Sequence, residues 1–105
     1  MDSKTLKKAF NFINERLFDD LLVMPHMLLV SDEDIMTLYP EYPDLMMHGL
    51  FFPEEYIIVI NDEALIFETV VHEMIHLWQY QNHKYMGHGG WFLIWSRKAI
   101  EEFYT

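Results

Sequence analysis

The stretch from Glu63 to Asn82 reads EALIFETVVHEMIHLWQYQN and is the most informative part of the sequence. It contains neither glycine nor proline, and apolar residues would occupy nearly every face of a helix formed by it. A helix that is apolar all round is covered on several sides, so we expect this segment to be the central helix of the fold. Asn61 and Asp62 precede it and are expected to cap its first turn.

Inside this helix, residues 72–76 form the pattern H-E-x-x-H. Residues four apart on a helix lie about 40° apart around its axis and one turn apart along it, so His72 and His76 can bind one metal ion. Glu73 lies beside them, where its carboxylate can take a proton from a metal-activated water and so promote peptide hydrolysis. The alternative is a pair of hydrogen-bonded core histidines with Glu73 in a salt bridge. Burying these three side chains without a metal would be costly.

A hydrolytic zinc site needs a third protein ligand. The metzincin spacing is absent, because Gln79 and Asn82 stand where that pattern has glycine and histidine. The downstream candidates are His83, His88, Glu101 and Glu102. His83 is expected at the end of the same helix, about 10 Å beyond the second histidine. His88 lies among glycines, which would allow the chain to fold back over the helix.

Two more helices are expected, one before and one after the central helix in the sequence. Residues 3–22 and about 90–103 both have apolar side chains that recur every three or four positions. Residues 83–90, HKYMGHGG, contain three of the four glycines in the chain and are predicted to form a loop before the last helix.

The strand signals lie between the first helix and the central one. Residues 26–30 (HMLLV) and 56–60 (YIIVI) are short, apolar and predicted to be strands. Residues 31–34 are interpreted as a polar turn, and residues 35–44, with two prolines, as a strand followed by irregular structure. A further apolar stretch covers residues 46–52. The order of helix, two or three strands, helix, loop and helix predicts an α+β fold.

Length and composition limit the alternatives. With 105 residues, of which 51% are hydrophobic, the chain is expected to form a single domain covering residues 1–105 with one core. The absence of cysteine excludes disulfides and zinc ribbons. No signal peptide and no apolar run of about 18–20 residues is found, so a cytoplasmic protein without membrane contact is expected.

The charge is strongly unbalanced, with 17 acidic and 7 basic residues and a formal net charge of −10. Such a balance opposes an electrostatic grip on DNA or on an anionic membrane. No direct DNA binding by this domain is therefore expected, whereas a protein partner with a basic surface is compatible with the charge.

The run HEMIHLWQ, followed after a short insert by GHGGWF, closely resembles the SprT-like metallopeptidase domain. That family pairs H-E-x-x-H with a downstream G-H-G-x-x-F, whose histidine completes a three-histidine zinc site. The resemblance implies a minimal zincin-like fold in which His72, His76 and His88 bind Zn²⁺. It also implies that Glu73 is the catalytic base of a peptidase acting on a protein or peptide substrate. The remaining motif positions hold Gly87, Gly89 and Phe92.

The sequence also departs from parts of this family. Many members add a C-terminal zinc ribbon built from cysteines, which this sequence does not contain. The related Spartan proteases cleave proteins crosslinked to DNA, but a net charge of −10 does not support carrying that substrate over. Two alternatives to a protease remain: a non-catalytic acidic interaction protein that mimics nucleic acid, and an inactive zincin scaffold.

Overall fold

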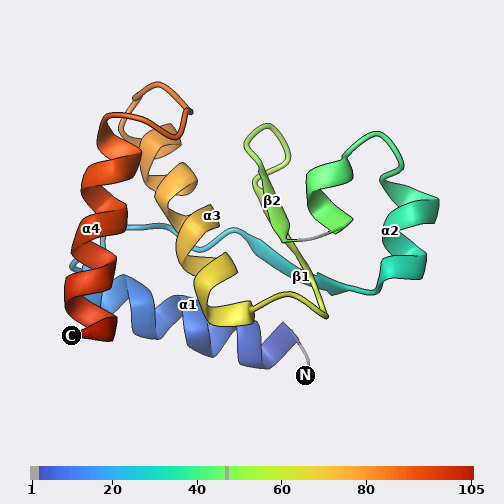
Figure 1. Cartoon of the computed structure of the whole chain (residues 1–105), viewed down its shortest axis with the longest axis horizontal. Coiled ribbons are helices and arrows are strands. Elements are labelled where there is room, and N and C mark those ends of the chain that lie inside the picture. The colour runs from blue at the N-terminus through green and yellow to red at the C-terminus, as the bar shows by residue number, and fades with distance from the viewer. Residues whose placement is uncertain (1–2, 47) are drawn as a thin grey trace.

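The computed structural model describes residues 3–46 and 48–105 and has an α+β architecture (Figure 1). Its helices are α1 (Ser3–Leu17), α2 (Asp32–Leu38), α3 (Ile66–Gln81) and α4 (Trp91–Tyr104), with a short 3-10 helix, η1, at Pro43–Met46. Its strands are β1 (His26–Val30), β2 (Gly49–Phe52) and β3 (Ile57–Asn61). The predicted fold class is therefore confirmed, and the predicted strands at 26–30 and 56–60 match β1 and β3 to within one residue.

The three strands form one mixed sheet in the order β1-β3-β2. Strand β1 runs parallel to β3 with His26 opposite Ile57, and β2 runs antiparallel to β3 with Gly49 opposite Ile60. The central strand is covered on both faces: Ile58 and Ile60 belong to the main core, whereas Val59 packs in a smaller cluster on the other side. Burial on both faces explains why β3 is a continuous apolar run.

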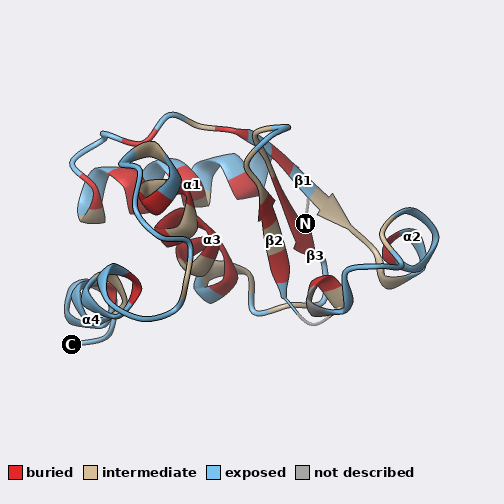
Figure 2. Cartoon of the chain, turned by 90° about the horizontal axis from the view of Figure 1, so that it is seen from above, coloured by how far each residue is buried: buried red, intermediate tan, exposed pale blue. Residues whose placement is uncertain are grey.

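Helix α3 is the central helix of the fold, as its apolar sequence predicts. It packs against α1, α4 and the strands β2 and β3. Figure 2 shows the buried residues gathered on β3 and on α1 and α3. Aromatic contacts link α3 to α4, with the Trp78 ring centroid 5.2 Å from those of Trp91 and Trp95. No helix in the described parts of the chain is both long and apolar enough to cross a bilayer.

The first helix ends at Leu17, five residues before the predicted end. Asp19 and Asp20 both have positive φ angles, 54° and 60°, which a helix cannot continue through. The buried side chain of Asn14 closes the turn, since its amide donates to the Leu22 carbonyl and accepts from the Leu22 N–H. The periodic apolar residues beyond the helix therefore belong to a side-chain-bonded turn.

The polar turn and the strand predicted from residue 31 onwards are wrong, because α2 forms there instead, whereas the irregular structure predicted after them is found at residues 39–42, before η1. Ser31 is the N-cap of α2, and its hydroxyl accepts from the Asp34 N–H at 3.2 Å. Three acidic residues fill the first turn, where the positive end of the helix dipole favours them. The signal was present in the sequence as a serine followed three residues later by an acid, a pattern typical of a helix start.

The central helix begins at Ile66, three residues later than predicted, and Leu65 caps it without a side-chain hydrogen bond. Asn61 is not its N-cap. Its side-chain oxygen accepts from the Glu63 N–H, and its amide donates to Asp32 and to the Met46 carbonyl. The side chain thus joins β3 to α2 and η1 and does not cap α3.

Candidate metal centre

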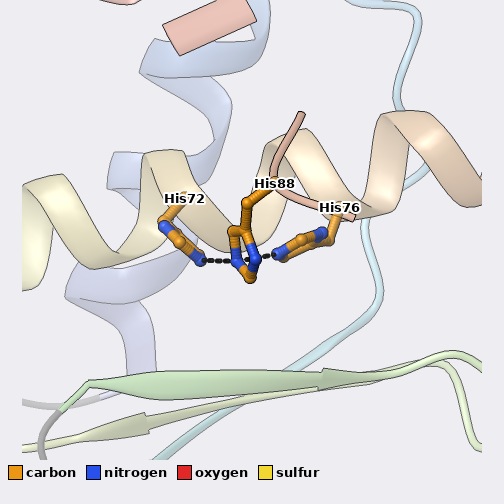
Figure 3. Close-up of side chains that lie close together, drawn as sticks. All are labelled: His72, His76 and His88. Atoms are coloured by element: carbon orange, nitrogen blue, oxygen red, sulfur yellow. Dashed lines mark hydrogen bonds between the residues drawn. The ribbon is translucent and has the colours of Figure 1, made fainter. Parts of the chain in front are cut away.

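Three histidine rings converge beside α3, two from the helix and one from the loop that follows it (Figure 3). The Nε2 atom of His88 lies 3.3 Å from Nε2 of His72 and 3.3 Å from Nε2 of His76. Two nitrogens bound to one tetrahedral zinc at about 2.0–2.1 Å would be separated by about 3.3–3.4 Å. Both distances from His88 match that spacing, and all three donor atoms lie within 4.8 Å of one another, so the donor set suits a zinc ion. The roles of these residues as ligands stay a prediction.

The end of α3 explains how the chain turns back towards the first two histidines. Asn82 is the C-cap, and His83 follows it with φ 55°. The His83 N–H bonds to the Tyr80 carbonyl and the Lys84 N–H to the Gln79 carbonyl, the two hydrogen bonds of a Schellman motif. The expected helical position of His83 is wrong, because the helix has already ended. His83 is exposed and is not part of the histidine cluster.

The loop from His83 to Gly90 carries the third histidine back beside α3. Among its glycines, Gly90 has a positive φ of 52° and is the N-cap of α4. The reversal expected from the glycines thus begins instead at a histidine in the left-handed region and ends at Gly90. Glu101 and Glu102, the other candidate ligands, are exposed on α4, and neither belongs to a metal-ligating group among the described residues.

Phe92 gives the three histidines a common wall. Its ring centroid lies 4.8 Å from those of His72 and His88 and 5.0 Å from that of His76. Only 8% of its surface is exposed. This contact supplies a physical reason for a phenylalanine four residues after the third histidine, because at the second residue of α4 the ring packs against all three histidines.

The role of Gln79 was not predicted from the sequence, where this residue is only a departure from the metzincin spacing. The Gln79 side chain is fully buried, with its oxygen 2.8 Å from Nδ1 of His76 and its amide nitrogen 3.0 Å from the Gly87 carbonyl. A glutamine inside a helix with apolar neighbours was the available signal, since a buried amide needs partners.

Glu73, the predicted general base, follows His72 on α3 and has only 2% of its surface exposed. Its carboxylate is thus withdrawn from bulk water into the protein interior. Electrostatic interactions are stronger there than in water. The catalytic role of Glu73 stays a prediction.

Two cavities flank His72. The larger, about 430 Å³, is also lined by His48, Glu63, Ala64, Leu65, Glu68 and Thr69. The smaller, about 170 Å³, lies between α3 and α4 and includes Phe92 and Tyr104. His72 therefore borders two spaces that a bound molecule could fill.

The surroundings keep the helix histidines neutral. Burial, together with the neighbouring His76, His88 and His48, lowers the pKa of His72 to about 4 from its ordinary 6.5. Burial also lowers the pKa of His76, partly opposed by the hydrogen bond to Gln79. Neutral imidazoles are the form that binds metals, so both rings are ready for a metal at neutral pH.

The metal-free protein is expected to lose stability as the pH falls from 7 towards 4. In this range the unfolded chain protonates His72 at its ordinary pKa near 6.5, whereas the native protein does not, so acid favours unfolding. Urea unfolding in chelator at several pH values should show this loss, and His72→Gln should show a smaller one. Equal pH dependence in the two proteins would contradict the prediction.

Together, the fold and the site define an α+β domain with a candidate three-histidine metal centre on an H-E-x-x-H helix. Residues 54–104, about half of the chain, match the model of the SprT-like family. The match confirms the resemblance found in the sequence, and the second half of the chain carries a SprT-like domain. No curated protein and no solved structure matches the chain.

Proposed function

We infer that this protein is a zinc-dependent peptidase in which His72, His76 and His88 hold the metal and Glu73 is the general base. The observation that carries this proposal is the convergence of the three Nε2 atoms, with both distances from His88 at 3.3 Å. The match to the SprT-like family supports a metallopeptidase of the zincin type.

The proposed chemistry divides between the metal and the chain. When bound, zinc supplies a Lewis acid that acidifies water and polarises a carbonyl group. Glu73 would take the proton of the attacking water at a carboxylate oxygen and pass it to the leaving amine. The peptide would lie against α3 in the cavities beside His72, with Phe92 holding the histidine rings in place.

The test joins metal analysis with a proteolysis assay. The purified chain is expected to hold about one zinc, to unfold several degrees lower in chelator, and to cleave an unfolded protein such as casein only when metal is present. Zinc returned to the chelated protein should restore cleavage. Bound zinc without cleavage would favour the inactive scaffold, and a metal-free chain with an unchanged melting curve would overturn the proposal.

The substrate is proposed to be a protein or peptide, and free DNA is expected not to bind tightly. The chain has only seven basic residues against 17 acidic ones, and its formal net charge is −10. Four of the seven, Lys4, Lys7, Lys8 and Arg16, are exposed on α1, which leaves three for the rest of the chain. At physiological salt, fluorescence anisotropy should therefore give no binding tighter than about 1 μM. Sub-micromolar binding that weakens with salt would contradict this.

A further inference from the structure

The side chain of Gln79 joins the two segments that supply the histidines. It has no exposed surface, and each of its two polar atoms is 3.0 Å or less from a partner. Its oxygen faces the His76 ring on the same helix, and its amide faces the Gly87 carbonyl in the loop, one residue before His88. Because burying an amide without partners is costly, these two contacts determine where the side chain lies.

The first contact selects the tautomer of the neutral His76 ring. An amide oxygen only accepts hydrogen bonds, so at 2.8 Å the Nδ1 atom of His76 must carry the proton and donate it to Gln79. The neutral ring then has its lone pair on Nε2, the atom that faces His88 at 3.3 Å. A hydrogen bond to the other ring nitrogen is how proteins orient a metal-binding histidine.

The second contact holds the loop that carries His88. The main-chain carbonyl of Gln79 accepts from the Lys84 N–H at 2.8 Å, and its side-chain amide donates to the Gly87 carbonyl at 3.0 Å. One residue therefore anchors the loop near its start and again next to His88. Since His88 is exposed, burial does little to hold it, and this anchor matters correspondingly more.

We propose that Gln79 is a positioning residue: it sets the tautomer of His76 and the position of His88. The affinity of the site for metal depends on this residue. The inference rests on the proposed three-histidine site, and it extends that site to a side chain that does not touch the metal. A break in either hydrogen bond misplaces a different ligand, so the loss of the whole amide affects two of the three.

The test compares Gln79→Met with a matched control, Gln81→Met. Gln81 is on the same helix and its amide also bonds to a distant segment, accepting from the Val23 N–H and donating to the Leu21 carbonyl. Both substitutions remove an amide and keep a similar volume. We expect zinc competition to show affinity about 10- to 100-fold weaker for Gln79→Met and near the wild-type value for Gln81→Met.

Nitrogen NMR of the metal-free protein gives a readout that a general loss of stability would not change. In the wild type and in Gln81→Met, His76 should carry its proton on Nδ1, whereas Gln79→Met should show a mixture of the two ring forms. This measurement on the wild type remains decisive even if Gln79→Met fails to fold, because a proton on Nε2 of His76 would overturn the inference.

The outcomes separate this inference from the proposed function. A wild type that binds zinc, with Gln79→Met binding within twofold of it, would overturn the role of Gln79 and leave the metal site standing. Equal losses in the Gln79 and Gln81 variants would also overturn it, since they would show a structural effect alone. A wild type without zinc affinity would overturn the proposed function, while the ring form of His76 would still test the positioning.

Discussion

Glu73→Gln is expected to keep the zinc content of the wild type and to lower the rate of peptide hydrolysis by at least about 100-fold, the usual minimum for losing a general base. The amide has nearly the size of the carboxylate but cannot take a proton from water. Metal content by elemental analysis and initial rates on an unfolded protein substrate, measured on the same preparations, check both parts of the prediction.

The chain offers a matched control in Glu68, another glutamate of α3 that lines both cavities beside His72. Its side chain is exposed and accepts a hydrogen bond from the Tyr104 hydroxyl at 2.7 Å. Because Glu68 lines the cavities but is not part of the histidine cluster, Glu68→Gln should keep the zinc content and most of the turnover rate at saturating substrate, with any effect on the KM for the substrate. If Glu68→Gln lost activity and Glu73→Gln kept it, the base would have to be reassigned. Melting temperatures of both variants show whether a loss comes from unfolding instead.

His88→Ala is expected to lose more zinc affinity than the roughly 10–100-fold typical when a residue that orients a ligand is removed. The Nε2 atom of His88 is the one that lies 3.3 Å from both other nitrogens, so its removal leaves two donors from one helix. Two histidines alone fall short of the three protein ligands of a hydrolytic zinc site. Competition with a zinc chelator of known affinity measures the loss.

His83→Gly is the matched control, because it removes the other histidine near the end of α3. His83 has φ 55°, a conformation that glycine adopts without the cost of about 1–2 kcal/mol that other residues incur. The variant should therefore bind zinc as the wild type does and unfold at the same or a higher temperature. A larger loss of affinity in His83→Gly than in His88→Ala would place the third ligand at His83 and remove the main support for the proposed site.

The helical part of the candidate site could be predicted because it depends on local geometry alone. The segment from Glu63 to Asn82 has no glycine or proline and forms α3 over Ile66–Gln81, and residues four apart on a helix lie on nearly the same face. His72 and His76 are brought together by that spacing without any help from the rest of the chain. The apolar residues around them likewise predicted that α3 would be covered by neighbouring elements.

Other local signals were present but were outweighed by stronger ones. The serine that caps α2 lies in a polar stretch that is equally typical of a turn, and the two prolines that follow favoured a strand and irregular structure over a helix at residues 35–44. Asn61 was expected to cap α3, but distant partners on α2 and η1 occupy its side chain. In both cases a polar side chain could make more than one set of hydrogen bonds, and the tertiary structure decided which set forms.

By itself, the sequence determined that a central helix carries H-E-x-x-H, that an α+β fold surrounds it, and that a glycine-rich loop follows it. Those features depend on propensity and spacing over a few residues. Only the tertiary structure decided how the loop returns, through a left-handed His83 and the two anchors of Gln79. These contacts bring His88 beside the helix histidines. They depend on the three-dimensional path of the chain, which no local sequence pattern contains.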